Sequence, residues 1–574
     1  MEIMSKSTRL MVAAIQCGST FFRFAFSLKN AWGQPFTQVW TGRSVSLITH
    51  KAPTCLLLKR DFTESLIGYE AEDKYSELED GDNDYHFFKH FTKILRQSDI
   101  KRHTLCCDVR GRSLKAILVL EHFIRCVKKI VHQRIMGIPD DDIDYVFTVP
   151  TTGEENAKLI VREAAVNAGI KREYLAIVLE SEAASIYCQY LKFAEKDTSS
   201  PVLGVVKPGT KYMLVHLESG TADITVHQKC EDNTLEEVLP ASGGPWGGKA
   251  VDDQFIKFLS ELVEEKVWEN FKSEHMEDYL DITWCFETKK RTIKPDKSGS
   301  TRMPIPHALL KLCTKSHSVE SFNEVIEKND AHKNNVSFMS GKLVWKNDFF
   351  RGFFKKTIDA IVKHMDDIFQ ESEARDVKII VMVGCFSGCP LVQDAVRKNF
   401  CNYSIIVPEV GDLAVLKGAV YSGHIPDAVS LRSARYTYGF QTWPEFNEDI
   451  HPEEKRVQCG KLSRCRDVFS KIVTKGDKIM AGFTKSQFFR VCCNRDNIVL
   501  ECGLFISEKK NPMFVDDPDC KSLGTLQVPF SPNKQNIETL VEEKLFFGMT
   551  ELKFTAEDIF SGLKFEISFD LPKE

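Results

Sequence analysis

Two short turns that combine glycine with hydroxyl residues are the first candidates for chemistry in this chain of 574 residues. One turn holds Ser219, Gly220 and Thr221, and it lies between an apolar segment and an alternating one within residues 212–228. That pattern predicts a β-hairpin. Glycine lets the backbone approach a ligand closely, and hydroxyl and amide groups can face an anion. A plain surface hairpin has the same pattern, so this turn alone does not establish an anion site.

A second turn of the same kind lies near the N-terminus. Residues 10–28 repeat the plan, with an apolar segment, a turn that contains Gly18, Ser19 and Thr20, and an alternating segment. The two turns are about 200 residues apart, and a repeat at that spacing indicates two similar lobes rather than a solenoid. We call residues 18–20 the first glycine turn and residues 219–221 the second. Their pairing favours a shared anion-binding role over two unrelated surface hairpins.

Two further glycine-rich segments precede predicted helices. The first covers residues 242–248, and the second follows an apolar strand predicted at residues 377–383. Glycine turns before a helix N-terminus often receive anions, although these segments match no fixed motif. The candidate ligand-facing residues in the two segments are Gly243, Gly244, Gly384, Cys385 and Phe386.

The elements that must position these turns alternate between helix and strand. The spacing of apolar residues predicts a helix at 113–136, a strand at 143–149, a helix at 154–168, a strand at 174–179 and a helix at 182–193. This alternation indicates an α/β lobe.

Two changes in composition divide the chain. A break rich in serine, proline and glycine covers residues 197–208, and from about residue 426 short alternating segments replace helical periodicity. The alternating segments predict a small antiparallel β domain. We therefore expect a first lobe at residues 8–200, a second lobe at 201–425 and a C-terminal β domain at 426–574.

The composition excludes several classes of function. A hydrophobic content of 43% and a charged content of 27% are ordinary for a globular protein. The net charge of -5 gives no footprint for nucleic acid or anionic membrane. No apolar run approaches the roughly 20 residues of a transmembrane helix, and the N-terminus lacks a signal-peptide pattern. We expect a cytosolic protein, with a nuclear location also compatible, whose 18 cysteines are reduced thiols.

Six short segments resemble one known family. They lie at residues 147–150 (Phe-Thr-Val-Pro), 179–191, 241–244, 286–291, 383–391 and 416–420 (Leu-Lys-Gly-Ala-Val). Together with the paired glycine turns, they resemble the heat shock 70 kDa family of the actin, hexokinase and heat-shock ATPase superfamily. Within that family the sequence is most similar to the divergent twelve-type branch. The resemblance covers nearly the whole chain, and the predicted β domain favours the chaperones over the sugar kinases.

The resemblance implies an α/β fold of the duplicated actin-like ATPase type, with ATP or ADP in a central cleft between two lobes. Without the resemblance, the charges at residues 287–291 are equally compatible with a solvated helix face. The implied nucleotide contacts are Glu287, Lys290 and Arg291 at the adenosine, and Gly384, Cys385 and Phe386 at the ribose and α-phosphate. Cys385 stands where the family has a glycine, which crowds the ribose.

The resemblance also assigns residues to the hydrolytic step. Glu180 matches the family's glutamate beside the hydrolytic water, and Asp223 matches the second aspartate of its second phosphate hairpin. The family's lysine that contacts the γ-phosphate corresponds either to Lys89 or to Lys93, and the sequence does not decide between them.

Two departures from the family's pattern concern the metal ion. Gln16 and His216 stand where the family has the aspartates that hold hydrated Mg²⁺. Because Mg²⁺ prefers oxygen ligands and above all carboxylates, these replacements argue against Mg²⁺ and leave no residue assigned as a metal ligand. His216 is equally compatible with a buried core histidine.

Glu218 adds a further obstacle to hydrolysis. It replaces a family glycine and brings a carboxylate near the expected β- and γ-phosphates. Two like charges about 4 Å apart repel by about 4 kcal/mol at an effective dielectric constant of about 20, unless the Glu218 side chain turns outward. Phosphoryl transfer depends mainly on positioning and on metal-assisted charge stabilisation. We therefore expect ATP hydrolysis to be weak or absent.

The leading interpretation is a chaperone-like protein that binds ATP or ADP, and a protein or peptide client through a C-terminal β domain without the family's helical lid. One alternative is an interaction scaffold that binds no nucleotide. The other is an active ATPase chaperone in which Asp223 and Glu180 suffice to organise Mg²⁺. Residues 428–434 are short and basic where the family has an acidic, leucine-rich linker, so we do not expect nucleotide-driven coupling between the two halves.

Overall fold

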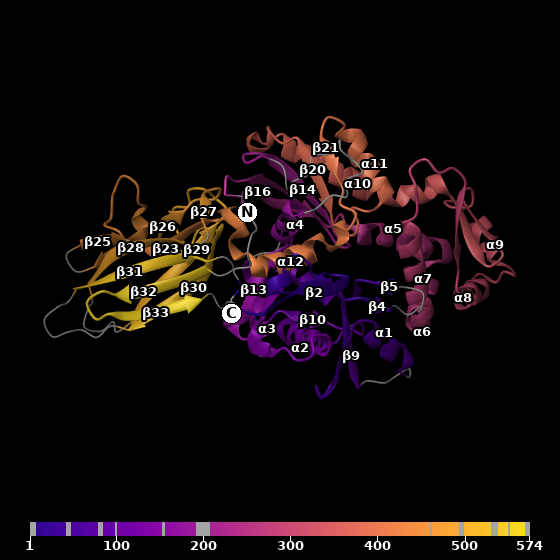
Figure 1. The fold of residues 1–574 in the computed structure, drawn as a ribbon, viewed down its shortest axis with the longest axis horizontal. Coiled ribbons are helices and arrows are strands. Elements are labelled where there is room, and N and C mark those ends of the chain that lie inside the picture. The colour runs from indigo at the N-terminus through magenta and orange to yellow at the C-terminus, as the bar shows by residue number, and fades with distance from the viewer. Residues whose placement is uncertain are drawn as a thin grey trace.

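The computed structural model contains two large mixed sheets with helices and a group of C-terminal strands (Figure 1). It describes residues 7, 9–41, 48–78, 84–97, 100–151, 155–190, 207–232, 234–459, 462–480, 482–492, 499–529, 538–548 and 552–568. Within these ranges, no helix combines the length and the apolar character that a membrane crossing requires.

The first large sheet is built from N-terminal strands in the order β13-β12-β1-β2-β3, with β6 also paired to β2. Its strands are β1 (Met11–Cys17), β2 (Phe21–Leu28), β3 (Phe36–Thr37), β6 (Ala52–Pro53), β12 (Ile143–Val149) and β13 (Leu175–Leu179). Alternate side chains of β1 enter different apolar clusters, with Met11 and Ala13 on one face and Val12 and Ala14 on the other. Because both faces are buried, the sequence of β1 is apolar almost throughout.

The second large sheet has the order β21-β20-β14-β15-β16-β22-β27. Its strands are β14 (Lys211–Leu217), β15 (Ala222–Lys229), β16 (Leu235–Gly244), β20 (Ile379–Val383), β21 (Ser404–Ile406), β22 (Val429–Ser433) and β27 (Lys478–Met480). Like the first sheet, it has an antiparallel hairpin (β14–β15) beside a parallel strand (β20).

Two helices, α4 (Glu180–Gln189) and α12 (Ala414–His424), lie between the two large sheets (Figure 1). One apolar cluster unites them with Val12 of the first sheet and Leu214 of the second. The two helices cross closely at Gly418, where an added Cβ would lie 1.7 Å from the carbonyl oxygen of Ala183. A glycine is therefore required at this crossing.

The other faces of the sheets carry further elements. Those near the first sheet are α2 (Ala116–Arg134), α3 (Glu155–Asn167), α1 (Gly68–Glu77) and the strands β4 (Trp40–Thr41), β5 (Ile48–Thr49), β7 (Cys55–Lys59), β8 (Ser65–Ile67), β9 (Tyr85–Lys89), β10 (Leu105–Cys107) and β11 (Ser113–Lys115). Those near the second sheet are α5 (Gly248–Val263), α6 (Glu265–Glu274), α7 (Met276–Lys290), β17 (Ser300–Pro304), α8 (His307–His317), α9 (Phe322–Lys328), β18 (Val336–Met339), β19 (Lys342–Lys346), α10 (Asn347–Phe369) and α11 (Pro390–Asn399).

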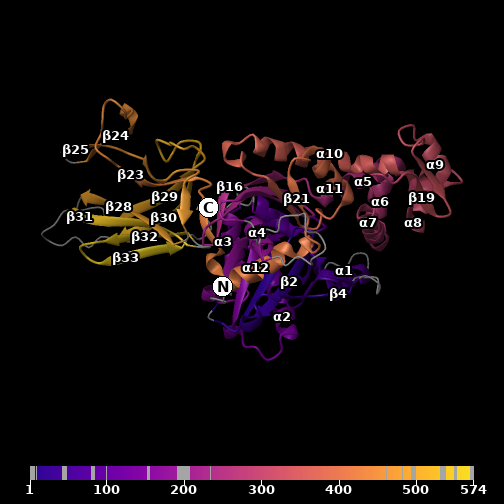
Figure 2. The same cartoon turned by 45° about the horizontal axis from the view of Figure 1, so that its top comes forward.

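Two four-stranded antiparallel sheets form the C-terminal part, in the orders β26-β23-β29-β30 and β28-β31-β32-β33. Their side chains share one apolar cluster, in which the rings of Phe440 and Phe554 lie 5.1 Å apart. In both views these strands lie at the end of the molecule opposite to α8 and α9 (Figure 2). The strands of these two sheets are β23 (Thr437–Thr442), β26 (Val468–Val473), β28 (Phe483–Cys492), β29 (Val499–Ser507), β30 (Cys520–Pro529), β31 (Glu538–Phe547), β32 (Leu552–Asp558) and β33 (Leu563–Ser568). A separate two-stranded sheet contains β24 (Arg456–Cys459) and β25 (Leu462–Cys465).

The predicted mixed α/β class is confirmed, and several predicted boundaries differ. The helix expected at 113–136 begins at Ala116, because residues 113–115 pair with β10 as a strand. The helix expected after residues 242–248 begins at Gly248, inside that segment, and ends at Val263, where Glu264 has φ of 76° and interrupts helical geometry. The break expected at 197–208 lies mostly outside the described residues, so the division into two lobes and a C-terminal domain stays a prediction.

Candidate functional site

The two glycine turns meet in the structure. A Cβ placed on Gly220 would lie 2.5 Å from Oγ of Ser19, so a larger side chain at residue 220 would have to displace Ser19. Residues 18–20 and 218–221 line one small cavity together with Glu180. Its volume is about 20 Å³, which is room for about one water molecule. The chain therefore brings together the predicted residues of both turns and Glu180.

Three buried side chains stand beside this cavity as a compact group. Glu180 is the first residue of α4, and His216 and Asp223 are directly paired across β14 and β15. One ligand atom from each lies within 4.8 Å of the others. Nδ1 of His216 is 3.9 Å from Oδ2 of Asp223. The hairpin register and the start of α4 together create this group.

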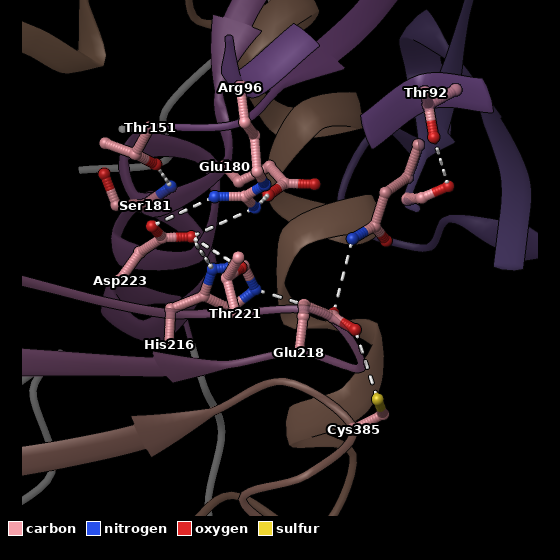
Figure 3. Close-up of polar contacts among 12 residues, drawn as sticks. Thr92, Arg96, Thr151, Glu180, Ser181, His216, Glu218, Thr221, Asp223 and Cys385 are labelled. Atoms are coloured by element: carbon pink, nitrogen blue, oxygen red, sulfur yellow. Dashed lines mark hydrogen bonds and ion pairs between the residues drawn. The ribbon is translucent and has the colours of Figure 1, made fainter. Parts of the chain in front are cut away.

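Arg96 supplies a positive charge to the same group (Figure 3). It ends a short 3-10 helix, Phe91–Arg96. Its Nη1 and Nη2 atoms lie 3.4 Å from the two carboxylate oxygens of Asp223, and Nη2 lies 3.8 Å from Oε2 of Glu180. The guanidinium also lines the small cavity. Arg96 is therefore a component of the candidate site that the sequence analysis missed.

The electrostatic setting differs among these groups. Burial raises the pKa of the Glu180 carboxyl, and the positive charges of His216 and Arg96 only partly offset that effect. Burial acts to lower the pKa of His216, but Glu218 and then Glu180 outweigh it and hold that pKa above its ordinary value. The imidazole is thus shifted toward its charged form, in which both ring nitrogens carry protons and neither can bind a metal.

The Glu218 side chain is directed into the site rather than outward. Its Oε1 atom lies 3.4 Å from Nη1 of Arg23 and 3.4 Å from Nε2 of Gln16, and Sγ of Cys385 lies 3.2 Å from Oε2. Although burial opposes ionisation of Glu218, Arg23 and then His216 outweigh it and hold its pKa well below the usual range. An ionised carboxylate therefore occupies the place beside the glycine turns.

The residues at this place do not fit Mg²⁺. Among the described residues, the group of acid, histidine or cysteine side chains close enough to hold an ion is Glu180, His216 and Asp223. It offers a nitrogen donor, whereas Mg²⁺ favours an octahedral shell of oxygen atoms. Both carboxylates already face Arg96, and Gln16 accepts a hydrogen bond from Arg23 at 3.1 Å. That Mg²⁺ is disfavoured here stays a prediction, now based on the donor types as well as on the sequence.

The predicted adenosine contacts form an internal charge cluster. Nζ of Lys290 lies 2.6 Å from Glu287 and 2.7 Å from Asp252, and it donates to the carbonyl of Gly248 at 3.0 Å. Lys290 is buried and Glu287 is partly buried, so these two charges do not lie on the solvated face that charge spacing alone allows. Arg291 also binds Glu287, at 2.6 Å, and its side chain stays 47% exposed.

Glu287, in helix α7 near the second sheet, also forms an ion pair with a residue next to the first sheet. Nζ of Lys51, next to the first sheet, lies 3.7 Å from Oε1 of Glu287 and 3.7 Å from the ring centre of Phe21. Burial lowers the pKa of Lys51 to about 8 despite the carboxylate of Glu287. A cavity of about 130 Å³ lies nearby, lined by Glu287, Trp284 and Thr20 among others.

The turn at Gly384 rests against the end of β14. Gly384 has φ of 91°, and an added Cβ would lie 2.4 Å from the carbonyl oxygen of Leu217. Only glycine fits this approach. The backbone N–H of Phe386 donates to the same oxygen at 2.9 Å. Cys385 faces Glu218, whereas Phe386 is buried behind Gly248.

Gly243 and Gly244 lie in strand β16 and not in the loop that the sequence suggested. They pair with Asp223 and Ala222 of β15. An added Cβ on Gly243 would lie 1.9 Å from the carbonyl oxygen of Ala222, so the glycine serves strand packing. Neither glycine lines the two cavities described above.

The two candidate lysines take different positions. Lys89 binds Glu72 at 2.9 Å and lines the larger cavity, and Lys93 is exposed. Neither lines the small cavity between the glycine turns, where Thr92 and Arg96 lie instead. The two arginines at the small cavity differ in how visible they are in the sequence. Arg23 could have been found, because it is a charged residue inside an otherwise phenylalanine-rich strand. The signal for Arg96 is weaker, because it ends a mixed segment whose periodicity is not helical.

Comparisons with known proteins extend over nearly the whole chain. No known protein-family model matches it. It is 28% identical to Heat shock 70 kDa protein 12A of Mus musculus and of Homo sapiens, over 99% of this chain and 92% of each relative. It is 26% identical to human Heat shock 70 kDa protein 12B, over 98% of this chain and 91% of that protein.

A more distant relative matches a shorter part. Chaperone protein DnaK of Mycoplasmopsis synoviae (strain 53) is 26% identical over 59% of this chain and 52% of its own length. The resemblance predicted from the six sequence segments is therefore confirmed. The chain is similar over nearly its whole length to heat shock 70 kDa proteins 12A and 12B.

Proposed function

We propose that this chain is a chaperone-like protein that binds ATP or ADP between its two glycine turns and hydrolyses ATP weakly or not at all. In this proposal the two large sheets are the cores of two lobes of a duplicated actin-like ATPase fold. The observation that carries the proposal is the meeting of the two turns, about 200 residues apart in sequence, beside the buried carboxylate of Glu180. The homology to chaperones of the heat shock 70 kDa type supports it.

Nucleotide entry requires the site to open. The two cavities have volumes of about 20 and 130 Å³, whereas pockets for small ligands usually measure about 300–1,000 Å³. The contact between Lys51 and Glu287 closes the region from one side. Opening would release Glu287 and the half-exposed Arg291 toward an adenosine and expose the backbone of the glycine turns to phosphates.

Weak hydrolysis follows from the residues around the cavity. Metal-assisted charge stabilisation is a main source of catalysis in phosphoryl transfer, and the donor set here does not fit Mg²⁺. Glu180 lines the small cavity, but the guanidinium of Arg96 lies 3.8 Å from its carboxylate. The Glu218 carboxylate stands where phosphate charge would accumulate, so hydrolysis lacks both its metal and its electrostatic setting.

A client-binding role for the C-terminal strands is part of the proposal. Strand β28 lies at an edge of its sheet, where its backbone groups can pair with an added strand. Phe483 and Phe488 of this strand are exposed. An edge strand with exposed aromatic side chains supports an extended peptide as the client.

A second candidate is an interaction scaffold that binds no nucleotide. The observation that favours it is the internal pairing of the charged residues, since Glu287, Lys290 and Glu218 all have oppositely charged neighbours within the chain. In that case the charge clusters serve packing alone.

The thermal stability of the full chain separates these functions. A ligand that binds only the native state raises stability by RT ln(1 + [L]/Kd), about 2.7 kcal/mol at about 100 times Kd. We expect ATP and ADP to raise the Tm, with little steady phosphate release. A Tm that no nucleotide changes, with or without Mg²⁺, would support the scaffold. A shift that requires Mg²⁺ and comes with steady phosphate release would support an active ATPase.

A further inference from the structure

Arg96 has the position of a built-in cation. Its guanidinium faces two carboxylates, Asp223 and Glu180, of which Asp223 is fully buried and Glu180 nearly so. It also lines the cavity that both glycine turns enclose. A phosphate held by the backbone of these turns would therefore meet this guanidinium directly.

The contacts of Arg96 with Asp223 and Glu180 are long. Its distances to Asp223 and Glu180 are 3.4 and 3.8 Å, whereas charge-assisted hydrogen bonds measure about 2.7–2.9 Å. Its side chain is 21% exposed, and that of Arg23 is 4% exposed. Arg23 is held by Gln16 and Glu218 inside strand β2. Of the two arginines at the cavity, Arg96 is the more exposed.

We infer that Arg96 takes the electrostatic role that a divalent metal would have here, so that a nucleoside phosphate binds to this chain without Mg²⁺. This inference rests on the proposed nucleotide binding and specifies how that site receives phosphate. A guanidinium is planar and presents two N–H groups to two phosphate oxygens at once. It remains charged at every physiological pH, so it neutralises phosphate charge as a bound ion would.

The position of Arg96 relative to the other cations supports this assignment. Lys89 is bound to Glu72 in the other cavity, and Lys93 is exposed. His216, in strand β14 of the hairpin, is fully buried. Among the described residues that line the small cavity, Arg96 is thus the permanently charged cation that is also partly exposed.

The test measures ADP and adenosine affinity for the full chain by calorimetry, in excess EDTA and in excess Mg²⁺. We expect the wild-type Kd for ADP to agree within roughly threefold between the two conditions. Arg96→Met is expected to weaken ADP binding by about tenfold or more, because a hydrogen bond to a charged group contributes about 1.5–3 kcal/mol. Adenosine lacks the phosphate, so its affinity should be the same in both proteins.

Two matched variants keep the test interpretable. Arg96→Lys keeps the charge beside Asp223 and Glu180 but loses the planar fork, and we expect it to weaken ADP binding less than Arg96→Met does. If Arg96→Met does not fold, the ADP affinity of Arg96→Lys is compared with that of the wild type instead. Arg302→Met removes an exposed arginine of β17 that lines neither of the two cavities, and it should leave ADP affinity unchanged.

Two outcomes would overturn the inference, and they are distinguishable. If ADP binds only with Mg²⁺, and both Arg96 variants bind it as the wild type does, the role of Arg96 is wrong while nucleotide binding stands. If neither ADP nor adenosine binds the folded wild-type chain under any condition, the proposed function fails and the inference fails with it.

Discussion

At the residue scale, pairs of opposite charge hold the interior of the candidate site. Arg23 faces Glu218, and Arg96 faces Asp223 and Glu180, with little exposure of any carboxylate to water. Removing one partner of such a pair leaves the other charge buried and uncompensated, which is more costly than removing both. These pairs therefore stabilise one arrangement of the two glycine turns even without a ligand.

The pair of Arg23 and Glu218 gives the first prediction. Arg23→Met should lower the free energy of unfolding by about 3 kcal/mol, because Glu218 then stays buried without its main partner. The double variant Arg23→Met with Glu218→Gln should lose less than the sum of the two single variants, by about 1 kcal/mol or more. Urea unfolding of the four proteins measures this coupling. Additive losses would mean that the pair is not coupled.

The pair also gives a pH dependence with a definite sign. The pKa of Glu218 lies below its ordinary value in the folded chain. As the pH falls, the unfolded chain therefore binds the Glu218 proton before the folded chain does. The stability that the ionised Glu218 contributes to the folded chain is complete near pH 7 and is lost below about pH 4.5. Glu218→Gln should remove that part of the acid sensitivity. The acid sensitivity is measured from the Tm of both proteins between pH 3 and pH 7, with about one reading per half pH unit.

Gln16 and His216, which by resemblance replace two aspartates of the family, give a further prediction. The double variant Gln16→Asp with His216→Asp restores two carboxylates, the ligands that Mg²⁺ prefers. We expect Mg²⁺ to strengthen ADP binding to this variant and to have little effect on the wild type. Calorimetric titration with and without Mg²⁺ measures the difference. An unchanged Mg²⁺ response would show that Gln16 and His216 do not stand at a metal-facing place.

At the element scale, the central crossing of α4 and α12 joins the two large sheets. Their side chains share an apolar cluster with strands of both sheets. Gly418 lets the helices meet at the backbone of Ala183. Because Glu180 begins α4, this crossing also fixes the position of the carboxylate beside the small cavity.

The close crossing of α4 and α12 predicts that one methyl group added at residue 418 lowers the stability of the chain strongly. Gly418→Ala would place a Cβ 1.7 Å from the carbonyl oxygen of Ala183, and separating the helices should cost about 3 kcal/mol of unfolding free energy. Gly352→Ala in α10 is the matched control, since an added Cβ meets no atom within 4 Å there. That control should stabilise the chain by about 0.5–1 kcal/mol. Equal effects in denaturant unfolding would contradict the close crossing.

Several elements of the site were predictable from sequence because their signals are local. The strands of both hairpins are buried on alternate or both faces, so their apolar patterns are strong. Arg96 had only a weak sequence signal, because a short 3-10 helix and a long side chain bring it to Asp223 from 127 positions away. Gly243 and Gly244 were misplaced because a glycine-rich run also suits a strand whose neighbour approaches closely.

At the scale of the whole molecule, the C-terminal strands stand apart from the site and carry a buried acid of their own. Glu543 of β31 accepts a hydrogen bond from Gln487 at 2.8 Å. Burial raises the pKa of Glu543 to about 7, and Gln487 and Cys502 offset this only in part. The C-terminal sheets are thus expected to respond to pH independently of the glycine turns.

The sign of that response follows from the raised pKa. Between about pH 4.5 and pH 7 the unfolded chain releases the Glu543 proton while the folded chain retains it. Stability therefore falls over this window, by on the order of 3 kcal/mol in total. Glu543→Gln should raise the Tm more at pH 8 than at pH 5, and Glu566→Gln, at an exposed position, should change it equally at both. An equal effect of Glu543→Gln at the two pH values would contradict the buried setting.

The central claim is that the meeting of the two glycine turns forms a nucleotide site. Calorimetric titration of ADP into the full chain and into Gly220→Val tests it most directly, because a side chain at residue 220 would press on Ser19 across the cavity. Gly33→Ala is the control, since an added Cβ meets nothing within 4 Å there. The prediction is that the wild type and Gly33→Ala bind ADP alike while Gly220→Val loses about tenfold or more in affinity. Equal binding by all three proteins, or none by the wild type, would contradict it.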